Sequence, residues 1–136
     1  MIGKRVLVVD DEPAVADFLR MVVELEGGTA VLAGTGAFAR ECVLTQRPFD
    51  LMVLDLELPD LSGWDLLAAL KDQLDACKVV IFSAQLTEES TVRASAAGVA
   101  SIVVKPATAA ALRDVFRSAL ELPPLGRRAD TPRLPP

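Results

Sequence analysis

"VLVVDDEP", residues 6–13, runs four branched apolar residues directly into three consecutive acids, Asp10, Asp11 and Glu12, and then a proline. An unbroken apolar run is typical of a β-strand that is covered on both faces, and Pro13 suits the first turn of a helix. The two aspartates therefore stand where a buried strand ends. Adjacent like charges raise one another's pKa values, so this stretch predicts a strand-to-helix junction that also carries a charged site.

Strand-like and helix-like patterns alternate along the rest of the chain. Apolar residues at positions i, i+3, i+4 and i+7 predict helices around 15–22 and 112–120, and Gly27, Gly28 and Gly98 are placed to end helices. Because several strand runs are almost wholly apolar, we expect a parallel sheet with helices packed on both faces. The expected strands are 6–9, 29–32, 51–54, 79–82 and 102–104.

Length and composition restrict the class of protein. The 136 residues suffice for one ordinary domain, and 19 acidic against 14 basic residues give a net charge of −5, which argues against direct nucleic-acid binding. No apolar run reaches the roughly 20 residues of a membrane span, so we expect a cytoplasmic protein. The chain has no histidine, which removes imidazole chemistry, and Cys42 and Cys77 are expected to be reduced packing residues.

The composition changes after Glu121. The stretch "LPPLGRRADTPRLPP", residues 122–136, holds five of the nine prolines and no periodic apolar pattern. We therefore predict a single domain over residues 1–121, followed by a disordered, proline-rich tail or linker over 122–136.

Polar side chains end four of the five expected strands. Asp10 and Asp11 follow the first, Asp55 the third, Ser83 the fourth and Lys105 the fifth. In an open parallel sheet, ligands bind beyond the carboxyl ends of the strands, so these side chains are expected to converge on one pocket. Three converging carboxylates call for a cation, and a set of oxygen ligands without histidine or cysteine favours Mg²⁺, with Mn²⁺ as a substitute.

These features together resemble the receiver domain of bacterial two-component response regulators. The resemblance covers residues 4 to about 121 and is carried, in family order, by "VLVVDDEP", "FDLMVLDLELPDLSGWDLL", "VVIFSA" and "GVASIVVKPA". It implies an α/β fold of the flavodoxin-like (βα)5 type, a doubly wound sandwich around a five-stranded parallel sheet of strand order 2-1-3-4-5.

The resemblance also implies roles for the acidic residues. Asp55 would be phosphorylated, and Asp11 and Asp55 would bind Mg²⁺ directly. The backbone carbonyl of Glu57 would be a further ligand, and Asp10 would act mainly through a metal-bound water. Lys105 would pair with phosphoryl oxygens, in keeping with a reaction that depends on positioning and charge neutralisation.

A second set of residues is implied to bind phosphate and to switch. Ser83, with Ala84 beside it, would hydrogen-bond the phosphoryl group and move the end of the fourth strand. Ile102 stands where the family usually has Tyr or Phe, so the aromatic part of the usual switch is missing. The Lys105–Pro106 bond is implied to be cis.

By this resemblance the protein accepts a phosphoryl group from a sensor histidine kinase or a histidine phosphotransfer protein. It would catalyse its own phosphorylation and dephosphorylation without turning over an external metabolite, so it would not be an enzyme in the usual sense. Its output would pass to an unknown downstream protein through a surface around the fourth helix, fifth strand and fifth helix. The sequence leaves the oligomeric state open.

Two alternatives stay open at this point. Glu57 lies two residues after Asp55, as a second acid does in Mg²⁺-dependent phosphatases that use an aspartyl-phosphate intermediate. Ile102 leaves room for a receiver-like interaction module whose binding does not depend on phosphorylation.

Overall fold

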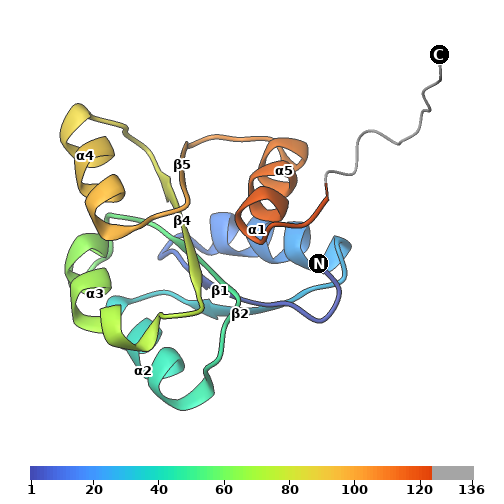
Figure 1. Cartoon of the computed structure of the whole chain (residues 1–136), viewed down its shortest axis with the longest axis horizontal. Coiled ribbons are helices and arrows are strands. Elements are labelled where there is room, and N and C mark those ends of the chain that lie inside the picture. Colours follow the sequence, from blue (N-terminus) through green and yellow to red (C-terminus); the bar gives the residue numbers. More distant parts are fainter. Residues whose placement is uncertain (124–136) are drawn as a thin grey trace.

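The fold is a five-stranded sheet between two layers of helices, seen in a computed structural model that describes residues 1–123 (Figure 1). The expected alternation of strands and helices is confirmed. The elements are β1 (Arg5–Val9), α1 (Pro13–Leu25), β2 (Thr29–Ala33), α2 (Gly36–Gln46), β3 (Leu51–Leu54), α3 (Gly63–Leu70), a short 3₁₀ turn (Lys71–Gln73), β4 (Lys78–Ser83), α4 (Glu88–Ala97), β5 (Ser101–Val104) and α5 (Ala109–Ala119).

All strands of the sheet are parallel, in the order β2-β1-β3-β4-β5. The predicted fold class and strand order are therefore confirmed. The chain reverses its direction of winding between β1 and β3, which places the carboxyl ends of these two strands side by side. Ligands of doubly wound sheets bind at such a point.

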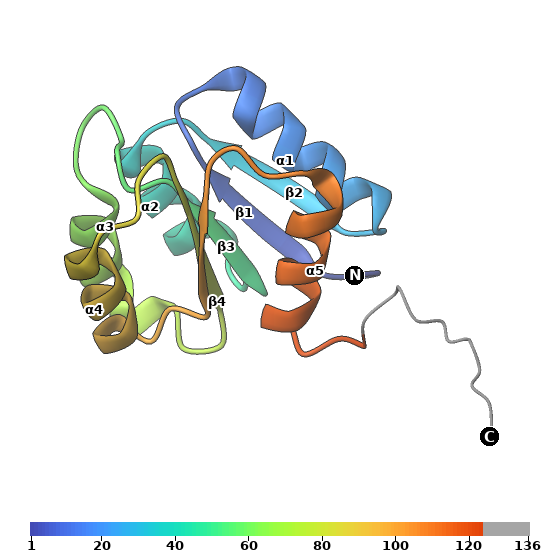
Figure 2. The same cartoon turned by 90° about the horizontal axis from the view of Figure 1, so that it is seen from above.

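The sheet is covered on both faces, as its apolar strands require. Val6 and Val8 of β1 face a core shared with α1 and α5, whereas Leu7 and Val9 face a core shared with α2 and α3. Successive side chains of a strand point to opposite faces, so a run with no polar position is what this two-sided burial needs. Figure 2 shows α1 and α5 together on one side and α2 and α3 on the other.

Short polar side chains cap the amino ends of most of the helices. Thr35, Ser62, Thr87 and Thr108 each accept a hydrogen bond from the backbone N–H three residues later, at the starts of α2, α3, α4 and α5. α1 instead begins at Pro13, as predicted. These caps satisfy amide groups that have no partner within the helix and fix where each strand-to-helix loop ends.

The sequence predicts that both cysteines are reduced packing residues. Cys42 is buried and Cys77 is partly buried, and neither forms a disulfide. Leu122 still packs against the α1/α5 core, while residues 124–136 of the predicted tail lie outside the described residues. Within residues 1–123, no helix is long and apolar enough to span a membrane.

Among the five α-helices of residues 1–123, α4 is the most weakly anchored. Its single buried residue is Ala94, and a cavity of about 620 Å³ lies between α4 and α3. Across this cavity, the Arg93 guanidinium stacks over the Trp64 ring at 5.0 Å. A helix with so little buried apolar surface is held to the sheet by a small free energy.

We therefore expect the backbone amides of α4 to exchange with solvent at least about tenfold faster than those of α5, which buries Leu112, Phe116 and Ala119. Hydrogen–deuterium exchange followed by mass spectrometry of peptides from the two helices measures this. Equal protection of α4 and α5 would contradict the structural assignment of α4 as the loosest element.

Candidate functional site

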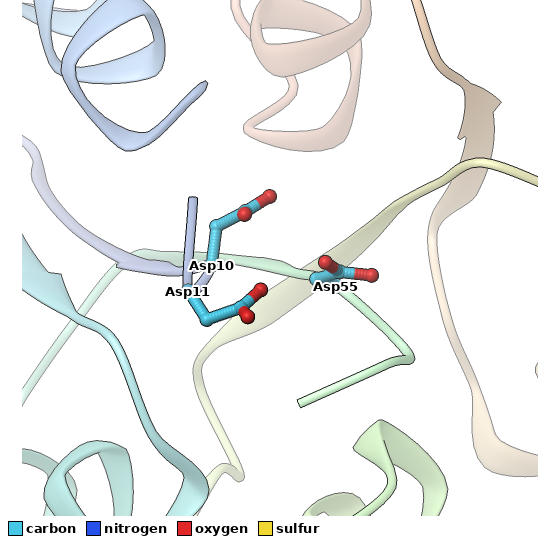
Figure 3. Close-up of side chains that lie close together, drawn as sticks. All are labelled: Asp10, Asp11 and Asp55. Atoms are coloured by element: carbon cyan, nitrogen blue, oxygen red, sulfur yellow. The ribbon is translucent and has the colours of Figure 1, made fainter. Parts of the chain in front are cut away.

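The candidate site lies at the carboxyl edge of the sheet, where β1 and β3 end next to one another. Asp10 and Asp11 follow β1, and Asp55 follows β3. One carboxylate oxygen from each lies within 4.8 Å of the others. Figure 3 shows the side chains of Asp10 and Asp11 projecting toward the side on which Asp55 lies. The three carboxylates that the sequence places at strand ends therefore lie together in the structure.

Lys105, which follows β5, joins two of these carboxylates. Its ammonium Nζ lies 2.9 Å from Asp10 Oδ2 and 3.2 Å from Asp55 Oδ2, and 3.7 Å from Glu12 Oε1. The Asp10 and Asp55 side chains are 1% and 8% exposed, so these are nearly buried ion pairs. Buried carboxylates without a nearby cation are strongly unfavourable, and Lys105 supplies that cation.

Burial and the neighbouring charges shift the pKa values of Asp10 and Lys105. Burial raises the pKa of Asp10 above its ordinary value, although hydrogen bonds from Lys105 and from the Glu12 amide oppose the rise. Burial by itself lowers the pKa of Lys105, but Asp10 and Asp55 together outweigh it and raise that pKa. Because the folded-state pKa of Asp10 is raised, the fold loses stability as the pH rises through that pKa and Asp10 ionises.

Asp55 is held between a tight loop and the start of α3. Its Oδ1 accepts a hydrogen bond from the Glu57 N–H at 3.0 Å. The Gly63 N–H donates a hydrogen bond to the Leu56 carbonyl at 2.8 Å, which closes the loop. A Cβ atom on Gly63 would lie only 2.8 Å from the Asp55 carbonyl oxygen. Glycine is therefore needed where α3 approaches the end of β3.

The residues implied to switch lie on the neighbouring strands. Ser83 is the buried last residue of β4, and its hydroxyl accepts a long hydrogen bond of 3.4 Å from the Gln85 N–H, whereas Ala84 is exposed. Ile102 is partly buried in β5. The next residue, Val103, packs on the α1/α5 core, so strand alternation turns Ile102 to the opposite face, toward α4. The Lys105–Pro106 bond is cis.

The chemistry of the cluster is compatible with a hard divalent cation. Three carboxylates lie close enough to share one ion, and oxygen is the ligand atom that Mg²⁺ prefers. Asp11 is exposed, so the cluster also opens to solvent and to an incoming anionic group. If a cation were bound, the cation and the Lys105 ammonium together would neutralise an anionic group placed beside the Asp55 carboxylate.

Two acidic residues have contacts here that sequence reasoning did not assign. Glu12 approaches Lys105 through its side chain and donates its N–H to Asp10 Oδ1 at 3.0 Å. Asp60, to which the sequence analysis gave no role, accepts hydrogen bonds from the Gly36 and Ala37 amides of α2. No local pattern could have indicated the Asp60 contacts, because the partners lie 23 and 24 residues away.

Comparison with known proteins gives a consistent result. A family model for the response regulator receiver domain matches residues 6–117. The chain is 39% identical over 101 residues to the probable transcriptional regulatory protein TcrX of Mycobacterium tuberculosis, covering 74% of this chain and 43% of that protein. It is 36% identical over 126 residues to the alginate biosynthesis transcriptional regulatory protein AlgB of Pseudomonas putida, covering 93% of this chain and 28% of that protein. The chain thus spans less than half the length of these relatives.

Solved structures agree with the fold. A CheY-like response regulator receiver domain protein from Methanospirillum hungatei superimposes with a TM-score of 0.81 at 26% identity, covering 87% of this chain and 94% of that one. The non-phosphorylated HemR receiver domain from Leptospira biflexa gives a TM-score of 0.80 at 26% identity, covering 89% and 97%. Most of the described chain therefore has a structural counterpart.

Two substitutions at the site should change stability in opposite directions in metal-free protein. Lys105→Met leaves Asp10 and Asp55 without their cation, so we expect the free energy of unfolding to fall by about 2–3 kcal/mol. Asp11→Asn removes one of three mutually repelling charges and leaves the Lys105 pairs in place, so we expect a rise of about 0.5 kcal/mol. Urea denaturation in the presence of EDTA measures both.

Added Mg²⁺ provides the control for this pair of variants. It should raise the unfolding midpoint of the unmodified protein more than that of Asp11→Asn, since the variant lacks one carboxylate of the cluster. A loss of stability in both variants under metal-free conditions would show that repulsion among the carboxylates is not the dominant energy at this edge.

Proposed function

The chain belongs to the response regulator receiver domain family, and on this premise we propose that it is a phosphorylation-dependent switch whose phosphoacceptor is Asp55. A sensor histidine kinase or a histidine phosphotransfer protein would donate the phosphoryl group from a phosphohistidine. A carboxylate oxygen of Asp55 forms the new bond to phosphorus. The bond from phosphorus to the imidazole nitrogen breaks, and that nitrogen keeps the electron pair.

The observation that carries this proposal is the position of the Lys105 ammonium, within 3.2 Å of both Asp10 and Asp55. A phosphoryl group bound to Asp55 would bring further negative charge to the place where this cation already lies. Phosphoryl transfer depends mainly on orientation and on neutralising the charge of the equatorial oxygens. Lys105 meets that need without having to move far from its present position.

We propose that Mg²⁺ completes the site. Asp11 and Asp55 would bind it directly, with the backbone carbonyl of Glu57 as a further ligand and Asp10 acting through a bound water. The close approach of three carboxylates, two of them nearly buried, supports this assignment. The ion would supply the additional positive charge that the carboxylates and the phosphoryl oxygens share.

The output surface is proposed to lie around α4, β5 and α5, and the switch is proposed to reach it from the end of β4. Ser83 would turn its hydroxyl from the Gln85 amide toward a phosphoryl oxygen, and Ala84 would move with it. Ile102 faces the α4 side of the sheet, so a displaced β4 end can reach α4 through aliphatic packing rather than through an aromatic ring. The weak anchoring of α4 lowers the free energy that such a shift requires.

The downstream partner is proposed to be a protein. The negative net charge gives this chain no electrostatic attraction for nucleic acid. The named relatives are transcriptional regulators of more than twice the matched length, so regulation of transcription would involve parts that this chain does not match. A cytoplasmic location is proposed to go with this role.

Phosphorylation tests the proposal directly. When the protein is incubated with acetyl phosphate and Mg²⁺, intact mass spectrometry should show one added phosphoryl group, and Asp55→Asn should gain none. Asp65→Asn, which changes an exposed aspartate within α3, is the matched control and should be modified like the unmodified protein. A label that persists in Asp55→Asn would overturn the choice of phosphoacceptor.

Two further assays on the same protein distinguish the proposed function from the two alternatives. Repeated release of phosphate from an ester substrate would favour a phosphatase. Partner binding that is unchanged by beryllofluoride, a phosphoryl mimic, would favour an interaction module that ignores phosphorylation.

A further inference from the structure

We propose that Asp60 is a positioning residue for the phosphoryl-transfer site, because its carboxylate ties the β3–α3 loop that carries Glu57 to the amino end of α2. The inference rests on the proposed function, since it concerns how the surroundings of Asp55 are held in place. Asp60 itself is an exposed residue of the loop between β3 and α3.

Both oxygens of the Asp60 carboxylate are used in this contact. Oδ1 accepts the Gly36 N–H at 2.8 Å, and Oδ2 accepts the Ala37 N–H at 2.9 Å. The next two amides of α2 have local partners, because Phe38 donates to Thr35 Oγ1 and Ala39 donates to the Thr35 carbonyl, each at 3.0 Å. The Gly36, Ala37 and Phe38 amides, which have no partner within the helix, are therefore all satisfied, two of them by a distant loop.

The β3–α3 loop and the amino end of α2 are in close van der Waals contact. A side chain at Gly36 would overlap Leu61 Cδ2, and its Cβ would lie 3.2 Å from Asp60 Oδ1. Leu61 packs against the core that the sheet shares with α2 and α3. The carboxylate and the neighbouring leucine together fix the position of this part of the loop relative to α2.

The other end of the loop is fastened to the phosphoacceptor. The Glu57 N–H donates to Asp55 Oδ1, and the Gly63 N–H donates to the Leu56 carbonyl. The backbone of Glu57 thus lies between two fixed points, Asp55 and Asp60. Its carbonyl is the proposed backbone ligand for Mg²⁺, and the direction of that carbonyl depends on both.

Asp60 is suited to position the loop rather than to stabilise the whole fold. The Gly36 and Ala37 amides hold the pKa of Asp60 below its ordinary value, so the carboxylate stays ionised near neutral pH. An anion is favoured at the positive end of a helix dipole. Because the side chain is exposed, solvent screens this energy, and the main consequence of the contact is the geometry that it imposes.

The test compares two caps of the same helix. Asp60→Ala frees the loop, so the dissociation constant for Mg²⁺, measured by isothermal titration calorimetry, should rise at least about threefold, toward the 10–100-fold that loss of supporting contacts commonly costs. The rate of phosphorylation by acetyl phosphate at subsaturating Mg²⁺ should fall by a similar factor. Asp60→Asn can accept one of the two N–H groups and should recover part of both losses.

Thr35→Ala is the matched control. It removes the other side-chain cap of α2, the hydrogen bond from Phe38, without touching the loop. Mg²⁺ binding by Thr35→Ala should therefore stay within about twofold of the unmodified protein, since a lost cap weakens mainly its own helix. Circular dichroism of each variant reports whether α2 is retained.

The outcomes separate this inference from the function on which it rests. If Asp60→Ala and Thr35→Ala weaken Mg²⁺ binding equally, Asp60 is only a helix cap and the inference is wrong, while the proposed function stands. If the unmodified protein binds no Mg²⁺ and gains no phosphoryl group, the proposed function falls and takes the inference with it. A selective loss in Asp60→Ala, partly restored in Asp60→Asn, supports both.

Discussion

The Lys105 ammonium between Asp10 and Asp55 is the interaction on which the carboxyl edge of the sheet depends. Two nearly buried carboxylates at the ends of neighbouring strands repel one another, and burial raises the pKa of Asp10 above its ordinary value. Lys105 offsets both effects from β5, reaching past β4 to a carboxylate 50 residues earlier in the chain. The charged edge can therefore form only when four strands are assembled in the correct order.

The elements on the α2 side of this edge are packed more tightly than those on the α4 side. On the α2 side, Asp60 and Leu61 bind the loop after β3 to a capped helix, and Gly63 brings α3 against the Asp55 carbonyl. On the other side, α4 buries only Ala94 and meets α3 across a cavity through the stacking of Arg93 on Trp64. A charge change at Asp55 would meet least resistance in the direction of α4, because packed elements move less readily than elements with little buried surface.

Much of the fold and most of the polar cluster could be predicted from the sequence, because a strand that is buried on both faces requires apolar residues along its whole length. An apolar run such as 51–54 predicts a central strand, and the first polar residue after it, Asp55, marks the strand end. The contacts of Asp60 could not be predicted in this way. Its neighbours along the chain carry no information about the amides of α2 that approach the same carboxylate.

By itself, the sequence determined which residues end the strands, where α1 begins at Pro13, and that several carboxylates must share an edge with a cation. Only the tertiary structure decided that Lys105 pairs with Asp10 and Asp55 while the Ser83 hydroxyl bonds to Gln85, and that Asp60 reaches α2. The reason is physical. Periodicity and turn chemistry depend on neighbours along the chain, whereas ion pairs and caps depend on distances that are set by how strands and helices pack.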